Sequence, residues 1–328
     1  MTRVLGMGNA LVDIMTRLEC DTLLHEFNLP KGSMQLVDKD AAEIVSKGTH
    51  HLPKQQSSGG SAANTIHGLA SLGIETGFIG TIGEDEFGLF FHEDLKKNNI
   101  QPQLFKGKYE SGRAIALISP DSERTFATFL GAAIELSVDH LSPAIFDGFD
   151  YFHIEGYLVQ NHDLIRKAVE LAKLKGLKVS IDLASFNVVE ANIDFLKEII
   201  RDYVDIVFAN EEEAKAFTGH EPEKALHEIA KDCEIAVVKV GKNGSLVMRD
   251  NFVYTIGVIK ANSIDTTGAG DVYASGFIYG LVKGLSMQKC GEIGSILSGK
   301  VIEVIGAKMD SPTWEHIRKM VADVEFSN

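Results

Sequence analysis

Residues 151–182, YFHIEGYLVQNHDLIRKAVELAKLKGLKVSID, hold the pattern that decides the fold. Residues 151–154 and 178–182 are short, mostly apolar runs typical of buried strands. Between them, apolar residues recur at helical spacing over 163–175, and Gly176 follows as a helix stop. A strand, a helix and a second strand in this order predict a βαβ unit, whose two strands lie parallel in one sheet.

The same alternation extends over most of the chain. Further strands are expected at 3–7, 33–37, 76–82, 113–119, 205–209, 235–240, 245–249 and 252–256, and further helices at 60–73, 189–201, 211–217, 223–231, 271–283, 287–305 and 312–322. We therefore predict an α/β fold, a doubly wound sheet with helices on both faces, in a single domain spanning residues 1–328. Residues 10–40 and 103–130 are poor in helical patterns and are predicted to form a small β-lid.

Composition limits the classes of function. With 32 Lys and Arg against 46 Asp and Glu, the formal net charge is −14, which disfavours binding to nucleic acid. The three cysteines lie far apart and form no CxxC motif, as expected for a chain in the reducing cytoplasm. No apolar run approaches the ~20 residues of a membrane span, so no membrane contact is expected.

Residues 264–271, IDTTGAGD, carry the strongest chemical signal and precede an apolar helix pattern. Gly268 and Gly270 lack a Cβ, so a bulky oxyanion can approach the backbone. The backbone amides of 268–271 would be the unpaired donors at the positive end of the helix dipole. They would form an anion hole for a phosphoryl group in transfer, with Asp271 beside it as a proton acceptor.

A second glycine-rich stretch, SGGSAAN at 58–64, opens another predicted helix. Its glycines allow a polyol to approach the backbone, and Asn64 can donate to and accept from hydroxyl groups. Near the N-terminus, Asp13 follows the first strand and can accept two hydroxyl hydrogen bonds from a vicinal diol. Taken alone, residues 58–64 are also explained as a glycine turn capped by Ser61. Asp13 alone is also explained as an ordinary loop residue.

Together these stretches resemble the ribokinase (PfkB) family of carbohydrate and nucleoside kinases. DTTGAGD at 265–271, followed by VYASGF, is similar to the family's C-terminal signature, and GGSAAN at 59–64, followed by LGIETGFIGTIGEDEFG, resembles the N-terminal one. The resemblance spans nearly the whole chain. It implies a Rossmann-like core with a β-lid, and transfer of the γ-phosphoryl group of ATP to a hydroxymethyl oxygen with the help of Mg²⁺.

The resemblance assigns roles residue by residue. It implies that Asp271 is the base, that Gly268, Ala269 and Gly270 form the anion hole, and that the sugar hydroxyls are held by Asp13, Gly59, Gly60 and Asn64. Residues 210–213, NEEE, match the family's NxxE motif, in which Asn210 and Glu213 act on metal and phosphate through water. On composition alone, these acidic residues would be an ordinary helix start favoured by the dipole.

The resemblance also implies where ATP and a monovalent cation bind. Residues 239–244, KVGKNG, resemble the nucleotide turn, with Gly241 and Gly244 at its glycine positions and Lys239 where the family often has Thr. A monovalent cation such as K⁺ would lie near Asp265 and Thr267, close to the backbone of 301–306.

The start of the chain favours a nucleoside as substrate. GNALVDI at 8–14 and KGSMQLVD at 31–38 resemble nucleoside kinases, so the leading hypothesis is phosphorylation of the 5′-hydroxyl of adenosine. Three lid phenylalanines are candidates to cover a purine, or else belong to the lid core: Phe105, Phe126 and Phe129. The alternatives are a sugar kinase of the ribokinase or fructokinase type, and a non-catalytic sugar or nucleoside sensor. Either a monomer or a homodimer is compatible with the sequence.

Overall fold

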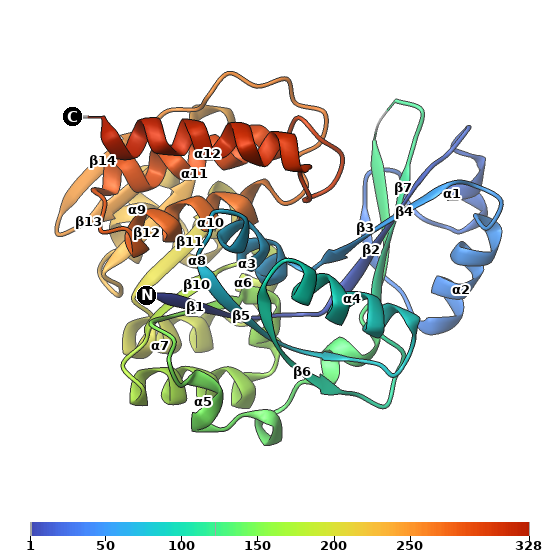
Figure 1. Ribbon diagram of the computed structural model, residues 1–328, viewed down its shortest axis with the longest axis horizontal. Coiled ribbons are helices and arrows are strands. Elements are labelled where there is room, and N and C mark those ends of the chain that lie inside the picture. Colours follow the sequence, from blue (N-terminus) through green and yellow to red (C-terminus); the bar gives the residue numbers. More distant parts are fainter. Residues whose placement is uncertain (1, 122, 328) are drawn as a thin grey trace.

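The computed structural model describes residues 2–121 and 123–327 and arranges their strands in two sheets (Figure 1). Within these residues the larger sheet has nine strands. In spatial order they are β14 (Phe252–Ile256), β13 (Ser245–Arg249), β12 (Ile235–Lys239), β11 (Ile206–Asn210), β10 (Lys178–Asp182), β9 (Tyr151–Glu155), β1 (Arg3–Met7), β5 (Glu75–Ile82) and β6 (Ile100–Lys106). Neighbours from β12 to β6 are parallel, and β13 and β14 are antiparallel. The predicted α/β fold is confirmed.

Helices cover both faces of this sheet and bury a separate apolar core on each (Figure 1). One layer contains α5 (His162–Leu174), α6 (Phe186–Ala191), α7 (Ile193–Tyr203), α8 (Glu211–Thr218) and α9 (Pro222–Ile229). The other contains α3 (Ser61–Ser71), α4 (Glu86–Lys97), α10 (Ala269–Val282), α11 (Met287–Val301) and α12 (Ser311–Phe326). In the part of the chain that the structure describes, no helix is long and apolar enough to cross a bilayer.

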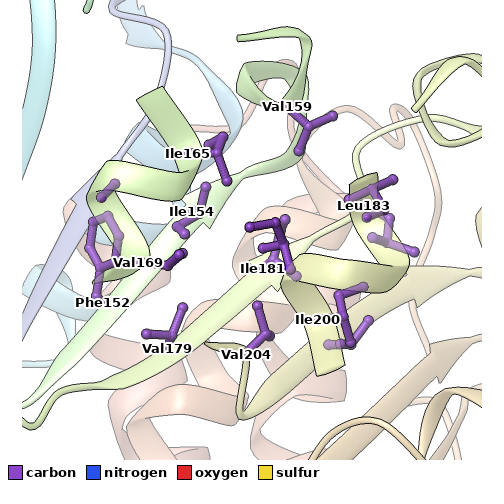
Figure 2. Packing of buried hydrophobic residues seen from close by; sticks show 14 of the residues in the cluster. Phe152, Ile154, Val159, Ile165, Val169, Val179, Ile181, Leu183, Ile200 and Val204 are labelled. Atoms are coloured by element: carbon purple, nitrogen blue, oxygen red, sulfur yellow. The ribbon is translucent and has the colours of Figure 1, made fainter. Parts of the chain in front are cut away.

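Helix α5 shows how the sequence pattern becomes packing. Asn161 caps its start by accepting a hydrogen bond from the Leu164 backbone N–H at 3.1 Å. Ile165 and Val169, four residues apart, lie on one face of the helix and pack over β9 and β10 (Figure 2). Gly176 follows the helix in the left-handed conformation, with φ of 78°.

The smaller sheet stands beside the larger one (Figure 1). Its strands, in spatial order, are β3 (Met34–Leu36), β8 (Arg124–Phe129), β7 (Gly112–Ile118), β2 (Leu11–Arg17) and β4 (Lys54–Gly59). Two helices, α1 (Thr22–Glu26) and α2 (Lys39–Gly48), contribute to a small apolar core of its own. This sheet corresponds to the predicted β-lid.

The boundaries of the predicted lid segments, 10–40 and 103–130, differ from the small sheet. Residues 100–106 form β6, which pairs with β5 at the edge of the large sheet, so the second segment begins only with β7. The small sheet also includes β4, whose sequence KQQSSG has no apolar residue to mark a strand. Its pairing with β2 rests on the backbone, which a side-chain pattern does not show.

Two predicted helices are shorter or divided. The helix expected at 189–201 is interrupted at Asn192, which separates α6 from α7. The helix expected at 287–305 ends at Val301, because the chain then turns back towards the start of α10. In that turn, the Ile302 carbonyl accepts hydrogen bonds from the N–H groups of Ile264 and Asp265 at 2.7 and 3.2 Å.

Helix α5 offers a matched test of the core. Leu164 is 1% exposed. Leu164→Ala should lower the unfolding free energy of the protein by about 2–5 kcal/mol, because the smaller side chain leaves a cavity in the core. Leu174 is 72% exposed, and Leu174→Ala should change it by less than about 0.5 kcal/mol. Urea unfolding of both variants measures their free energies of unfolding. An equal loss of free energy in the two variants would contradict the packing described.

Candidate active site

Three neighbouring strands of the large sheet end in polar residues at the same edge. β10 ends at Asp182, β11 at Asn210 and β12 at Lys239. Together with residues at the starts of α3 and α10, these side chains line a cavity of about 920 Å³. This is the crevice at the carboxyl ends of parallel strands, where α/β sheets bind ligands.

Asp271 lies in the first turn of α10 and faces the first turn of α3. Ser61 Oγ donates to its Oδ1 at 2.7 Å, and Asn64 Nδ2 donates to its Oδ2 at 3.0 Å. Burial raises the pKa of Asp271 to about 6, although both hydrogen bonds favour the ionised form. The Asp271 side chain is therefore mostly ionised at neutral pH, and its pKa is close to the value that suits a proton acceptor.

The glycine-rich turn before Asp271 adopts a conformation that requires glycine. Gly268 is the N-cap of α10 with φ of 75°, and a Cβ there would overlap the Ala307 side chain. The Ala269 N–H donates to the Thr266 carbonyl at 3.2 Å and closes a turn. The sequence prediction placed all three amides of 268–270 in the anion hole, but the structure uses the Ala269 amide within the protein.

Lys239 places a positive charge beside this turn. Its Nζ donates to Asp182 Oδ2 at 2.7 Å, and a Cβ on Gly270 would lie 3.0 Å from that Nζ. Burial opposes the charged form, but the carboxylates of Asp182 and Glu213 raise the pKa of Lys239. The ammonium group thus reinforces the free N–H groups in the first turn of α10 as a site for an anion.

Asn210 and Glu213 are joined in a capping box at the start of α8. Asn210 Oδ1 accepts from the Glu213 N–H at 2.8 Å, while Asn210 N and Nδ2 donate to the Glu213 carboxylate at 2.8 and 2.7 Å. Burial and the nearby Asp182 raise the pKa of Glu213 well above its usual range. A nearby cation would favour its ionised form.

The donors at this edge fit Mg²⁺ held largely by phosphate and water. Among the described residues no group of three or more His, Cys, Asp or Glu side chains has the arrangement of a metal site. Mg²⁺ commonly keeps several waters and binds one or two carboxylates together with substrate phosphates. The oxygens of Asn210 and Glu213, beside the anion site, suit that arrangement.

The predicted nucleotide turn lines the same cavity. Gly241 and Gly244 have φ of 54° and 93°, and both line the cavity. A Cβ at Gly244 would overlap the Ile256 carbonyl of β14, so only glycine allows the turn to lie against this strand. Val258 and Ile259 add an apolar wall suited to a flat ring.

Asp13 lies in β2 of the small sheet and lines the cavity from that side. Burial raises its pKa to about 7, partly opposed by Lys308. A Cβ at Gly59 would overlap the Asp13 carboxylate, so Gly59 makes room for this side chain, a role different from the predicted contact with hydroxyl groups. Asn64 Oδ1 is buried without a hydrogen-bond partner among the described residues and is free to accept from a hydroxyl.

A second cavity of about 570 Å³ adjoins the first, and both are lined by Leu11, Gly60, Ser61 and Tyr157. Its apolar walls come mainly from Met34, Leu36, Leu130, Ile134, Leu158 and Val188, and its amide groups from Asn9, Gln160, Asn161 and Asn187. No Lys, Arg or His is found among the described residues that line it. The cavity is therefore suited to an uncharged ligand with apolar faces and polar edges.

Glu155 is a residue of this region that sequence reasoning missed. It ends β9, and its carboxyl group accepts from Asn9 Nδ2 at 2.5 Å and from the Ala62 N–H at 3.1 Å. Burial raises its pKa to about 7. Glu155 and Asp182 each close a buried, mostly apolar strand, and that position was the signal available in the sequence.

Asp265 and Thr267, the predicted neighbours of a monovalent cation, lie together beside the glycine-rich turn. Arg124, which sequence reasoning also missed, reaches them from β8 and places its guanidinium on the Asp265 carboxylate. The expected cation position therefore already holds a positive charge from the protein.

The three phenylalanines predicted to lie in the lid have different surroundings, and Phe105 belongs to β6 of the large sheet. Phe126 lines the larger cavity. Phe105 stacks on His140 and packs against the core that α5 to α9 cover on one face of the large sheet. Phe129 packs against the core of the small sheet. Phe126 is thus the one of these three rings that the structure places at a cavity.

Comparison with known proteins agrees with this geometry. Residues 37–314 match the model of the pfkB family of carbohydrate kinases, and the chain belongs to this family. It is accordingly an ATP-dependent sugar or nucleoside kinase, and the non-catalytic sensor considered from the sequence is not supported.

Similar proteins include kinases for different acceptors. The solved adenosine kinase of Sinorhizobium meliloti is 33% identical, with a TM-score of 0.87, and the match covers 97% of this chain and 99% of that one. A solved probable sugar kinase of Rhizobium etli CFN 42 is 32% identical, with a TM-score of 0.88 and coverage of 99% and 100%. A 5-dehydro-2-deoxygluconokinase of Clostridium perfringens is 30% identical over 284 residues, or 80% of this chain and 83% of that protein.

The charge cluster at Lys239 predicts a pH-dependent change in stability. Lys239→Met leaves the buried carboxylates of Asp182 and Glu213 without their cation and should lower the unfolding free energy by about 3–5 kcal/mol. The loss should be larger at pH 8 than at pH 6. The reason is that a carboxyl whose pKa is raised in the folded state destabilises the fold progressively as pH rises.

Urea unfolding at the two pH values measures this effect, with Lys215→Met as the control. Lys215 pairs with Glu221 on the exposed surface, so its loss should change stability by less than about 1 kcal/mol at either pH. A K239M protein as stable as the wild type at pH 8 would contradict the electrostatic description of the site.

Proposed function

We propose that this kinase phosphorylates the 5′-hydroxyl of a purine nucleoside, with adenosine as its main acceptor. The observation that carries the proposal is the second cavity, which adjoins Ser61 and has apolar walls, several amide groups and no cationic side chain among the described residues. A purine has apolar faces and an edge of hydrogen-bond donors and acceptors. Amides such as Gln160 and Asn187 can both donate to and accept from such an edge.

A sugar acid suits this cavity less well. The Clostridium perfringens relative is named for a gluconate derivative, and a gluconate carries a carboxylate. In this chain that charge would enter a cavity with no cationic side chain among its described lining residues and next to the carboxyl group of Glu155. A neutral sugar such as ribose or fructose avoids this repulsion but leaves the apolar walls without a partner.

In the proposed mechanism the ribose lies where the two cavities meet. Asp13 and Asn64 Oδ1 accept hydrogen bonds from its hydroxyls, so that the 5′-hydroxyl points towards Asp271. Asp271 accepts the proton of that hydroxyl as the hydroxyl oxygen bonds to the γ-phosphorus of ATP, and the bond from that phosphorus to the β,γ-bridging oxygen breaks to release ADP. The first turn of α10 and the Lys239 ammonium stabilise the charge on the transferred group. When bound with ATP, Mg²⁺ neutralises charge on the phosphates, and Asn210 and Glu213 would hold it through water.

The base assignment predicts a specific pH profile. Because the pKa of Asp271 is raised to about 6 and the base acts ionised, kcat/KM should rise with pH through about 6 and level off above about 7. Asp271→Asn should lower kcat by about 10²–10⁴-fold and abolish this rise of kcat/KM with pH. The affinity for the acceptor should stay within about threefold. If kcat/KM of D271N still rises with pH through about 6, another group is the base.

The acceptor assignment is tested by a panel of adenosine, inosine, ribose, fructose and 5-dehydro-2-deoxygluconate, with ADP release as the readout. Adenosine should give the highest kcat/KM, and both purine nucleosides should exceed the sugars and the sugar acid, because they combine a neutral charge with a purine that fits the second cavity. The matched control is 5′-deoxyadenosine, which lacks the attacking hydroxyl and should bind without being phosphorylated. Preferential turnover of the sugar acid would overturn the proposal.

A further inference from the structure

The carboxylate of Asp265 is buried and almost fully engaged by the protein itself. Its Oδ1 accepts from the Thr267 N–H at 3.0 Å, and its Oδ2 accepts from the Gly306 N–H at 2.7 Å. Arg124 Nη1 lies 2.6 Å from Oδ2 and donates to Thr267 Oγ1 at 3.2 Å. The side chains of Arg124 and Asp265 are 9% and 5% exposed, so water contributes little to this arrangement.

A buried carboxylate at this position needs a positive charge beside it, because an unpaired buried charge is strongly unfavourable. A bound K⁺ could supply that charge, but it requires a shell of several oxygen atoms. Both lone-pair positions of Oδ2 are occupied by N–H donors, and Oδ1 retains one. A K⁺ ion would also lie close to the guanidinium, which repels it. The residues present therefore do not fit a monovalent cation.

The ion pair also joins two parts of the fold. Arg124 is the first residue of β8 in the small sheet, and Asp265 lies three residues before the N-cap of α10. Through the hydrogen bond to Thr267, the same guanidinium reaches the turn that leads into Gly268. The charge that completes this turn is thus supplied by the sheet that carries Asp13.

We propose that Arg124 is a built-in cation of the turn that opens α10, so that this kinase needs no monovalent cation. Arg124 is a positioning residue: it neutralises Asp265 and fixes the turn, and thereby places the amides of the first turn of α10 for the phosphoryl group.

The wild-type protein tests this directly in KCl and in choline chloride at equal ionic strength. The midpoint of thermal unfolding, measured without substrates, should differ by less than about 1 °C between the two salts, because an ion that binds only the folded state would raise it. The rate of ADP formation with adenosine should differ by less than about twofold. The activity measurement rests on the proposed function, but the thermal measurement does not. Failure of the proposed function can therefore be distinguished from failure of the proposal about Arg124.

Variants at position 124 supply the second arm. Arg124→Gln should lower kcat by about 10-fold or more in choline chloride, with KM for the acceptor little changed, because the turn loses its charge. KCl or guanidinium chloride should restore part of that rate, and KCl should raise the unfolding midpoint of R124Q by about 2–4 °C. Arg124→Lys should retain more activity than R124Q and show no response to K⁺.

Arg113→Gln is the matched control, since Arg113 is equally buried in the small sheet but pairs with Glu110. It should lower stability without creating a response to K⁺. A saturable activation of the wild type by K⁺ of about 10-fold or more, or a rise of several degrees in its unfolding midpoint, would overturn the proposal. So would an R124Q protein with wild-type kcat in choline chloride.

Discussion

The hydrogen bonds from Ser61 and Asn64 to the Asp271 carboxylate join two helix starts that are about 210 residues apart in the sequence. They bring the positive ends of α3 and α10 to one point, and the rest of the site is arranged around that point. The same contacts explain how a carboxylate can be buried and still be ionised near neutral pH. Burial raises its pKa, and the hydrogen bonds from Asn64 and Ser61, together with the charge of Lys239, limit that rise.

The site contains more buried carboxylates than cations. Burial raises the pKa of Asp13, Glu155, Glu213 and Asp271, and the positive charges facing them come from Lys239, Lys308 and Arg124, which also pairs with Asp265. A further carboxylate on the acceptor would add to this excess, whereas a cation that arrives with ATP would reduce it. The charge balance therefore favours a neutral acceptor and a metal-bound donor, even though the net charge of the chain is −14.

The sequence predicted the regular elements well where apolar periodicity is strong. The strands at 3–7, 178–182, 245–249 and 252–256 match the structure residue for residue, because each is marked by a short buried run or by a clear turn. It also predicted which stretches line the larger cavity, because the glycine-rich stretches at 58–64 and 264–271 each open a helix. It missed β4 because a polar strand held by backbone pairing leaves no side-chain pattern.

Long-range pairs were also beyond the sequence. Arg124 and Asp265 are 141 positions apart in numbering, and nothing in the local pattern of either one indicates the other. The hydrogen bond of the Ala269 amide was beyond the sequence for a related reason: whether a first-turn amide is free depends on the turn before it, where the Thr266 carbonyl accepts from Ala269 N–H. Glu155 was detectable in principle, since an acidic residue at the end of a buried strand must have partners.

The small sheet contributes to both cavities and to the turn before α10. Its strands supply Asp13 to the larger cavity, Met34 and Leu36 to the acceptor cavity, and Arg124 to the turn before α10. A shift of this sheet relative to the large one would therefore change the acceptor site and the phosphoryl site together. Because the ion pair between Arg124 and Asp265 is buried, breaking it without replacement is costly, so the pair favours the arrangement in which both sites are formed. In the proposed mechanism, the position of one sheet thus couples binding of the acceptor to the geometry of phosphoryl transfer.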